Sequence, residues 1–325
     1  MQRLRLQKIR LSLPWVNKNK NKREEAFLVG NSKKKLSLGQ KQSLAGWIFL
    51  TPAVILIAVM SFLPMIQALF LSFHTGIGAA MKWTGGTNYI RMFKDPVFMQ
   101  ALKNNFIYLI IQVPIMLISA LVLASLLNNK DLRFKWLFRT AIFLPCATSL
   151  VSYAVIFRSL FAVDGLVNIV LIKLGILTTG YNFLGHPNSA RIVIILALIW
   201  RWTGYNMVFY LSGLQNIEYS VYEAAKIDGA SPFQSFFRIT IPLLKPTILL
   251  TAIMSTNGTL QLFDESVNLT NGGPANSTIT MSHYIYNVSF KYVPNFGYAA
   301  SMSYLILILV AVLAFIQLKV GDKRD

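Results

Sequence analysis

The sequence predicts an all-α, polytopic membrane protein with six transmembrane helices. Of its 325 residues, 54% are hydrophobic and only 13% are charged, which is too apolar a composition for a soluble globular domain. Six continuous apolar stretches reach the ~20 residues that a helix needs to cross a bilayer. Because a bilayer offers the backbone no hydrogen-bond partners, these stretches are expected to cross it as helices. The expected spans are residues 44–73, 105–127, 136–161, 192–215, 241–262 and 298–318.

Prolines lie inside the first three spans. Pro52 and Pro64 are in the first, Pro114 is in the second and Pro145 is in the third. A proline removes one backbone donor and clashes with the carbonyl four residues earlier, so these helices are expected to bend.

The positive charges predict the orientation. Twenty-two of the 31 Lys and Arg residues precede the first span, follow the last, or lie in the second-to-third and fourth-to-fifth connections. Cytoplasmic flanks carry such an excess, so both termini are expected in the cytoplasm. Orientation explains most of the net charge of +19, and no nucleic-acid-binding motif accompanies it.

Three regions follow from this topology. Residues 1–43 form a basic cytoplasmic tail, residues 44–318 a six-helix transmembrane domain, and residues 319–325 a short cytoplasmic tail. The first tail has no continuous apolar core, so it does not read as a cleavable signal peptide. It either lies on anionic membrane lipid or is a disordered leader that enforces topology.

The connection between the fourth and fifth spans, within residues 217–246, predicts two short helices joined at a bend. Val221–Ile227 favours a first helix, and Gly229 stands where a helix ends on a left-handed residue. Ser231, Pro232 and Gln234 then form a capping box with proline at the first helical position. Phe233, Phe236 and Phe237 give the second helix an aromatic face. An ordinary cytoplasmic turn is the alternative, but it would need no aromatic face. Docking to another protein explains this face better.

The same stretch carries a family resemblance. Glu223-Ala224-Ala225, Asp228-Gly229-Ala230 and Ile241-Pro242, with Pro246, resemble the EAA loop of bacterial ABC-importer permeases. Further along, Phe263-Asp264-Glu265 and the run from Leu269 to Pro274 resemble the carbohydrate branch, the maltose/glycerol-phosphate-type permeases. The likeness covers roughly Leu44 to the C-terminus and implies the type I importer fold.

The resemblance implies a set of partners and a location. Such permeases work with a second homologous permease, two nucleotide-binding ATPase subunits and an extracytoplasmic sugar-binding protein, in the bacterial cytoplasmic (inner) membrane. ATP and Mg²⁺ would be held by the ATPase subunits, and this chain would bind no cofactor. The residues implied in ATPase coupling are Glu223, Ala224, Ala225, Asp228, Gly229, Ala230, Pro232, Phe233 and Pro242.

Polar residues inside the spans are candidates for a substrate path. Ionisable side chains at membrane depth usually face a cavity or a partner, and Arg158 and Arg201 are of this kind. The fifth span is polar in its outer half, from Ser255 to Glu265. Aromatic rings beside amides and charges make a plausible saccharide surface. The candidates are Trp200, Arg201, Tyr205, Asn257, Gln261, Asp264 and Glu265.

Simpler roles remain open for these residues. Arg158 can extend to the outer interface, and Ser, Thr and Asn can join helices by hydrogen bonds. The basic residues would suit an acidic or uronic oligosaccharide, but topology and packing explain them equally well.

The sequence contains no machinery for catalysis. It lacks the Gly-x-x-x-x-Gly-Lys-Ser/Thr phosphate loop, its three histidines are scattered, and its single cysteine cannot assemble a thiol metal site. A non-catalytic permease subunit for sugar is therefore expected. Two alternatives to a permease subunit are a secondary transporter and a membrane-embedded enzyme. A secondary transporter would need midplane acidic residues and repeated spans. A membrane-embedded enzyme such as a glycosyltransferase would need a metal-binding acidic motif.

Overall fold

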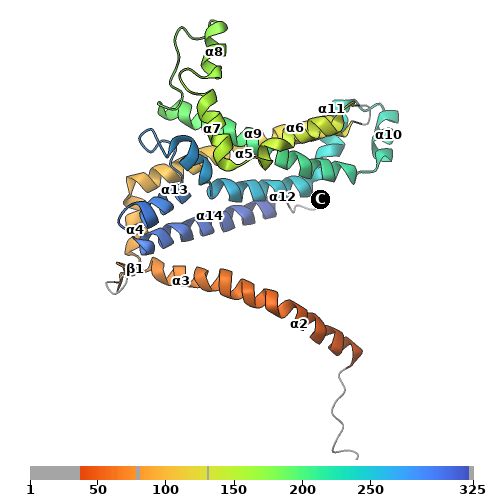
Figure 1. The fold of residues 1–325 in the computed structure, drawn as a ribbon. Helices are drawn as coiled ribbons and strands as arrows, with labels where there is room; N and C mark the ends of the chain where they lie inside the picture. The colour runs from red at the N-terminus through yellow and green to blue at the C-terminus, as the bar shows by residue number, and fades with distance from the viewer. Residues whose placement is uncertain (1–36, 78–80, 130–131, 322–325) are drawn as a thin grey trace, which may run out of the picture. The chain divides into compact units, whose positions relative to one another are not determined.

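The computed structural model describes residues 37–77, 81–129 and 132–321, which are predominantly helical (Figure 1). The chain divides into two units, Met1–Met65 and Ile66–Asp325. Most of the predicted basic tail, residues 1–36, and the last four residues of the predicted C-terminal tail lie outside the described residues.

The described part of the first unit is one apolar helical stretch. Helix α2 (Leu38–Ile57) begins at a capping box in which Ser37 and Gln40 each accept a hydrogen bond from the other's backbone amide. The helix therefore starts at Leu38, before the predicted span begins at residue 44. The π-helical segment η1 (Ala58–Phe62) follows and leads into α3 (Leu63–Ser72), which continues into the second unit. The wider turn of η1 immediately precedes Pro64, whose ring would crowd a regular α-turn.

The second unit is a helix bundle with a short ribbon at its start. Strand β1 (His74–Thr75) pairs antiparallel with β2 (Lys82–Trp83), with His74 opposite Trp83. The remaining elements are α4 (Thr87–Lys94), α5 (Pro96–Asn128), α6 (Lys135–Ala147), α7 (Leu150–Leu160), α8 (Leu166–Lys173), α9 (Pro187–Gln215), α10 (Tyr219–Ile227), α11 (Pro232–Ser235), η3 (Phe236–Thr240), α12 (Ile241–Leu260), η4 (Ser266–Thr270), α13 (Met281–Tyr286), η5 (Asn287–Lys291) and α14 (Phe296–Gly321).

The predicted spans correspond to these helices. Within the described residues, five helical stretches are long and apolar enough to cross a membrane: Leu38–Ser72, Pro96–Asn128, Pro187–Gln215, Pro232–Leu260 and Phe296–Gly321. The pair α6 and α7 makes a sixth crossing if it is taken as one span. Its two halves meet at 99°, so the third span predicted over residues 136–161 is two helices in the structure and not one bent helix. The predicted bend is therefore a complete break, and it lies at Thr148 and Ser149, just after Pro145, which is still inside α6.

The fifth span also differs from its prediction. Helix α12 ends at Leu260, so Gln261, Asp264 and Glu265 belong to the segment that follows it and not to the outer half of a helix. At its other end the helix is longer than predicted, because α11 runs through η3 directly into α12.

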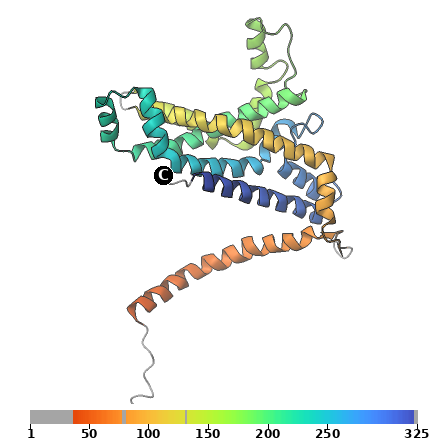
Figure 2. The same cartoon turned by 180° about the vertical axis from the view of Figure 1, so that it is seen from behind.

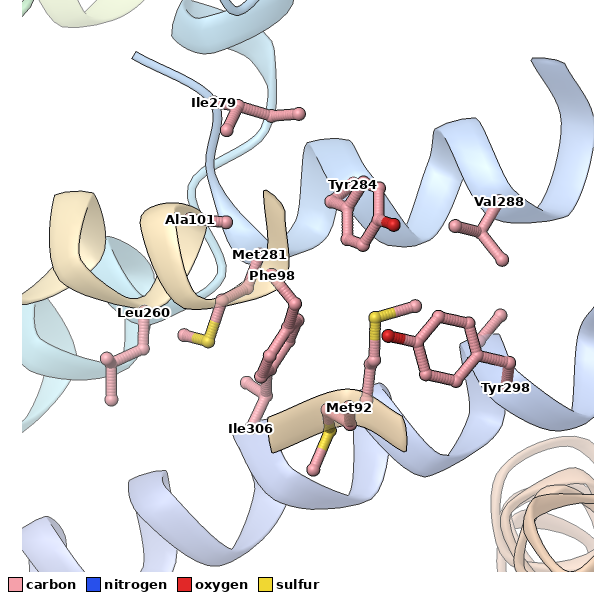
Figure 3. Packing of buried hydrophobic residues seen from close by; sticks show 12 residues of the cluster. Met92, Phe98, Ala101, Leu260, Ile279, Met281, Tyr284, Val288, Tyr298 and Ile306 are labelled. Atoms are coloured by element: carbon pink, nitrogen blue, oxygen red, sulfur yellow. The ribbon is translucent and has the colours of Figure 1, made fainter. Parts of the chain in front are cut away.

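Helices α5, α9, α12 and α14 run side by side through the bundle, and α6 lies along α9 (Figures 1 and 2). Buried apolar side chains form three clusters between them. The one nearest α4, α13 and the start of α14 contains Phe98, Met281 and Tyr298 (Figure 3). Helices α10 and α11 lie at the opposite end of the bundle from α4 and α13 (Figures 1 and 2).

Asp95 joins three elements at the α4–α13 end. Its carboxylate caps α5 by accepting from the amide of Val97 at 2.9 Å. It also accepts from the hydroxyls of Tyr284 on α13 and Tyr298 on α14, at 2.6 and 2.7 Å. Burial opposes ionisation, but these hydrogen bonds outweigh it and hold the pKa of Asp95 below its ordinary value. The ionised carboxylate therefore fixes this end of the bundle.

Candidate functional site

The connection between α9 and α12 forms a rigid elbow, which we define as residues 219–240. Helix α10 ends in a Schellman motif: the amide of Gly229 donates to the Lys226 carbonyl at 3.1 Å, and that of Ala230 to the Ala225 carbonyl at 2.9 Å. Gly229 has a φ of +79°, a left-handed conformation that glycine adopts without strain. The predicted first helix and its glycine end are confirmed.

The second arm of the elbow starts immediately after the first ends. The Ser231 hydroxyl accepts from the Gln234 amide at 3.2 Å, and the Gln234 side chain accepts from the Ser231 amide at 2.8 Å. The predicted capping box is therefore present, and only Ala230 separates it from Gly229. The expectation of a second short helix is wrong, since α11 continues through η3 into α12. Both caps leave little freedom at the bend, and the second arm is continuous with α12, whereas residues 216–218 separate the first arm from α9.

The π-helical segment η3 accommodates a proline in this continuous helix. The amide of Ile241 donates to the carbonyl of Phe236, five residues earlier, and Pro242 follows at once. The same arrangement precedes Pro64 in the first span. The wider turn moves the preceding carbonyls away from the proline ring, so the helix passes Pro242 without a break.

The elbow presents apolar side chains away from the bundle. Ile227 is 85% exposed, Phe233 73% and Phe237 50%, and the two phenylalanine rings lie 4.5 Å apart. Phe236, the third member of the predicted aromatic face, is half-buried. Of the residues implied in coupling, Glu223, Ala224, Asp228, Gly229, Pro232, Phe233 and Pro242 are exposed, Ala230 is half-buried and Ala225 is buried.

Contacts behind the elbow connect it to the core. Tyr222 on α10 hydrogen-bonds Thr240 at 3.1 Å, which joins the first arm to the start of the fifth span. An apolar cluster then packs α5, α9 and α12 together, with Leu214 and Leu244 among its buried members. A force on the elbow would therefore reach α9 and α12, the helices that also form the cavity described next.

A cavity of about 430 Å³ lies among α5, α7, α9, α12 and the segment after α12. This volume falls in the range of small-molecule pockets, roughly 300–1,000 Å³. Its wall mixes apolar, aromatic and polar side chains. The lining residues are Gln112, Met116, Leu150, Leu198, Arg201, Trp202, Tyr205, Asn206, Met254, Ser255, Gly258, Thr259, Gln261, Leu262, Phe263, Asp264 and Glu265.

Arg201 is the only basic side chain of this wall, and it is 5% exposed. Its guanidinium donates to the carbonyls of Pro145, Cys146 and Thr148 and to the Thr148 hydroxyl, at 3.0–3.4 Å. These groups form the break between α6 and α7, where carbonyls have lost their helical partners. The guanidinium also lies 4.8 Å from the centre of the Tyr153 ring. Arg201 thus stabilises the break from the neighbouring helix.

The cavity collects five of the seven predicted substrate-path residues: Arg201, Tyr205, Gln261, Asp264 and Glu265. Trp200 instead packs against Tyr153 and Phe157 of α7, with ring centres 6.4 and 5.4 Å apart. Asn257 is exposed and accepts a hydrogen bond from Gln261. Neither lines the cavity. Arg158, the other arginine predicted to lie at membrane depth, is exposed on α7.

Several lining residues were not predicted. Trp202 and Asn206 stand four residues apart, as Arg201 and Tyr205 do, so their helical spacing indicated a shared face. Gln112 and Met116 show the same spacing on α5, but nothing local to that helix indicated that it faces α9 and α12. Gln112 accepts from the Thr259 hydroxyl at 3.2 Å across the wall.

The segment that follows α12 is held by buried polar side chains. Asn105 donates to the carbonyls of Thr259 and Leu260 and accepts from the Met281 amide, all within 2.9–3.0 Å. Arg191 donates to the Ser277 carbonyl at 2.8 Å. His283, 1% exposed, hydrogen-bonds Ser266 at 2.8 Å, and burial lowers its pKa from 6.5 to about 4. These contacts fix Asp264 and Glu265 at the cavity.

Among the described residues, no group of three or more His, Cys, Asp or Glu side chains is arranged to hold a metal ion.

Comparison with known proteins identifies a family. The family described as binding-protein-dependent transport system inner membrane component matches residues 104–324. The lactose transport system permease protein LacF of Rhizobium radiobacter is 51% identical over 290 residues, which cover 89% of this chain and 97% of LacF. The arabinooligosaccharides transport system permease protein AraP of Bacillus subtilis (strain 168) is 33% identical over 284 residues, covering 85% and 88%.

Solved structures share the fold. A chain of a bacterial ABC transporter involved in the import of the acidic polysaccharide alginate superposes with a TM-score of 0.77 at 22% identity, over 88% of this chain and 97% of that one. The alginate transporter in complex with a pentasaccharide-bound periplasmic protein gives 0.69 at 23% identity, over 87% and 94%. The predicted importer-permease fold is confirmed. The chain belongs to the binding-protein-dependent transport system inner membrane component family, a family of multi-pass transport permeases.

Proposed function

We propose that this chain is the membrane-spanning permease subunit of an ATP-driven, binding-protein-dependent importer of oligosaccharides. The family match and the curated relatives, which carry lactose and arabinooligosaccharide permease names, support the substrate class. The observation that carries the mechanism is the rigid elbow, whose exposed apolar face lies on α10 and on the helical extension of α12 formed by α11 and η3. An apolar face of this kind is typical of a site that docks another protein.

The partner at the elbow is an ATPase subunit in this proposal. Glu223 and Asp228 flank the apolar face with exposed carboxylates that can orient a docked groove by polar contacts. When two ATPase subunits close on ATP and Mg²⁺, they would displace the elbow. Because the second arm continues into α12, and Tyr222 of the first arm hydrogen-bonds Thr240 at the start of that helix, the displacement would move α12 directly and α9 through its packing against α12. This is coupling between two sites through an element with two positions.

The cavity is this chain's share of the substrate path. It lies between α9 and α12, so the same displacement would change its access. Its aromatic rings can cover a sugar face, and its amides and hydroxyls can bind sugar hydroxyls. A second, homologous permease would complete the path.

Orientation follows from the charges at the two ends of the bundle. The elbow end carries Lys226, Arg238 and Lys245, together with basic residues at the start of α6 and the end of α14. We therefore assign this end, and both termini, to the cytoplasm. The opposite end would meet the extracytoplasmic binding protein. Exposed Phe290, Tyr292 and Val293 at η5 offer apolar contacts there.

Purification of the affinity-tagged chain from its native membrane tests this proposal. A nucleotide-binding subunit and a second permease should copurify, and proteoliposomes with the binding protein should take up saccharide only with ATP. Uptake driven by an ion gradient without ATP would indicate a secondary transporter. Glycosyl transfer by the purified chain would indicate an enzyme.

A further inference from the structure

The charged side chains that line the cavity differ in how many hydrogen bonds they make within the protein and in how exposed they are. Three lining residues are charged: Arg201, Asp264 and Glu265. The lining includes no lysine and no second arginine. Within this chain's wall, an anionic sugar could therefore be recognised only by Arg201.

Arg201 is already engaged by backbone. Both terminal nitrogens of its guanidinium donate to the break between α6 and α7, and its contacts there are three carbonyls and one hydroxyl. None of these hydrogen bonds is to Asp264 or Glu265, although the guanidinium also acts on Glu265 through its charge. Recognition of a carboxylate by arginine is strongest when two parallel N–H groups are available, and only the buried Nε lacks a partner. Withdrawing the terminal nitrogens to bind a ligand would remove the donor that Arg201 supplies to the carbonyls of Cys146 and Thr148 at the 99° break, whereas the Pro145 carbonyl would keep its hydrogen bonds from Thr148.

Asp264, which is half-buried at the cavity wall, is then the charge most available to a ligand. Glu265 beside it is 4% exposed and interacts with Arg201 and Tyr153, in the segment that Asn105 and Arg191 hold in place. Both oxygens of a carboxylate accept hydrogen bonds, so sugar hydroxyls can donate to them. A carboxylate-bearing sugar would instead meet like charge in a largely buried site, where such repulsion is costly.

We infer that this cavity accepts neutral saccharides and rejects those carrying a carboxylate, with Arg201 acting as a positioning residue for the α6–α7 break. The inference rests on the proposed function and specifies its substrate class. It replaces the acidic or uronic oligosaccharide suggested by the basic residues of the sequence. The solved alginate transporters share the fold, but their substrate does not transfer to this chain, because the side chains of the wall decide the charge preference.

Uptake by the complete complex in proteoliposomes tests the inference. The assay compares lactose with a disaccharide of the same size that contains one glucuronic acid, each with the binding protein and ATP. Lactose should be preferred by about tenfold or more, the scale expected for one unfavourable charge contact. Because the binding protein also selects, the decisive result is the change in this ratio when only the cavity is altered.

Two sets of variants separate the roles. Asp264→Asn combined with Glu265→Gln should reduce the preference for lactose at least about threefold, since the repelling charge is gone. Asp164→Asn, an exposed carboxylate outside the cavity, is the matched control and should leave the ratio unchanged. Arg201→Gln should slow the uptake of both sugars by the same factor, measured per assembled complex. Arg201→Lys should be faster than Arg201→Gln, because the lysine ammonium can still donate to the carbonyls.

Some outcomes would overturn the inference. Equal or faster uptake of the glucuronide, a ratio unmoved by the Asp264 and Glu265 changes, or a selective loss of glucuronide uptake in Arg201→Gln would each do so. Failure of the proposed function looks different: wild-type vesicles would take up neither sugar with ATP, or no nucleotide-binding subunit would be present.

Discussion

Replacing Gly229 by valine tests whether the elbow must keep one shape. A Cβ built on Gly229 meets no atom within 4 Å, so the substitution causes no collision. Its whole effect is on the backbone, because a φ of +79° costs a residue with a side chain about 1–2 kcal/mol, and a β-branched one at least that. The strain can be relieved only by changing the Schellman geometry.

The alternative conformations cost a similar amount. Releasing the strain breaks the two hydrogen bonds from the amides of Gly229 and Ala230, each worth about 0.5–1.5 kcal/mol. The native and altered elbows are then close in free energy, and a substantial fraction of molecules should hold the aromatic face at a wrong angle. The bundle itself should remain folded, since Gly229 is exposed and the caps lie outside its core.

The assay compares coupling with assembly. In proteoliposomes, Gly229→Val should lower both uptake and binding-protein-stimulated ATP hydrolysis severalfold, with normal amounts of the chain in the membrane. Gly229→Asn is the matched control, because asparagine tolerates the left-handed conformation, and it should stay near wild type. Wild-type uptake and stimulated hydrolysis in the valine variant would refute the docking role of the elbow.

Three further changes probe the supports of the two sites. Asp95→Asn should lower the stability of the α4–α13 end by about 1.5–3 kcal/mol, measured by thermal unfolding in detergent, because the phenols of Tyr284 and Tyr298 lose a charged acceptor. When both tyrosines are already phenylalanine, Asp95→Asn should lower the stability much less, because no phenol is left to lose its acceptor. Since the pKa of His283 is about 4 when folded and 6.5 when unfolded, its neutral state stabilises the protein fully above pH 6.5 and loses this contribution as the pH falls toward 4. His283→Asn should flatten the stability curve in that window, and an unchanged slope would contradict the assignment. Ser231→Ala should cost the elbow about 0.5–2 kcal/mol and reduce coupling less than Gly229→Val, with hydrogen exchange at the start of α11 as the readout.

The elbow was predictable because its determinants are local. A glycine end, a serine cap, a proline at the first helical position and a glutamine three residues past the cap specify a bend within ten residues. The continuation of α11 into α12 was not predictable, because Pro242 suggested a boundary and the π-helical turn that accommodates it has no clear sequence signal. The spans were predictable for a related reason, since lipid imposes a minimum apolar length.

The cavity depends on contacts between residues far apart in the chain. Pro145 predicted a bend in the third span, but the bend becomes a break whose carbonyls are bound by Arg201, more than fifty residues later. Sequence reasoning identified Arg201 as a charge at membrane depth and could not tell that its terminal nitrogens face backbone. Likewise, Asn105 in the second span fixes the segment that holds Asp264 and Glu265, a contact that neither helix signals by itself.

Cross-linking from the elbow would test the central claim most directly. In a Cys146→Ser background, Phe233→Cys gives the chain one thiol, placed on the exposed aromatic face. The account predicts that this thiol is labelled only from the cytoplasmic side and cross-links to a nucleotide-binding subunit, with a yield that changes when ATP binds. Labelling from the outside, or an actively transporting complex in which position 233 contacts no such subunit, would contradict it.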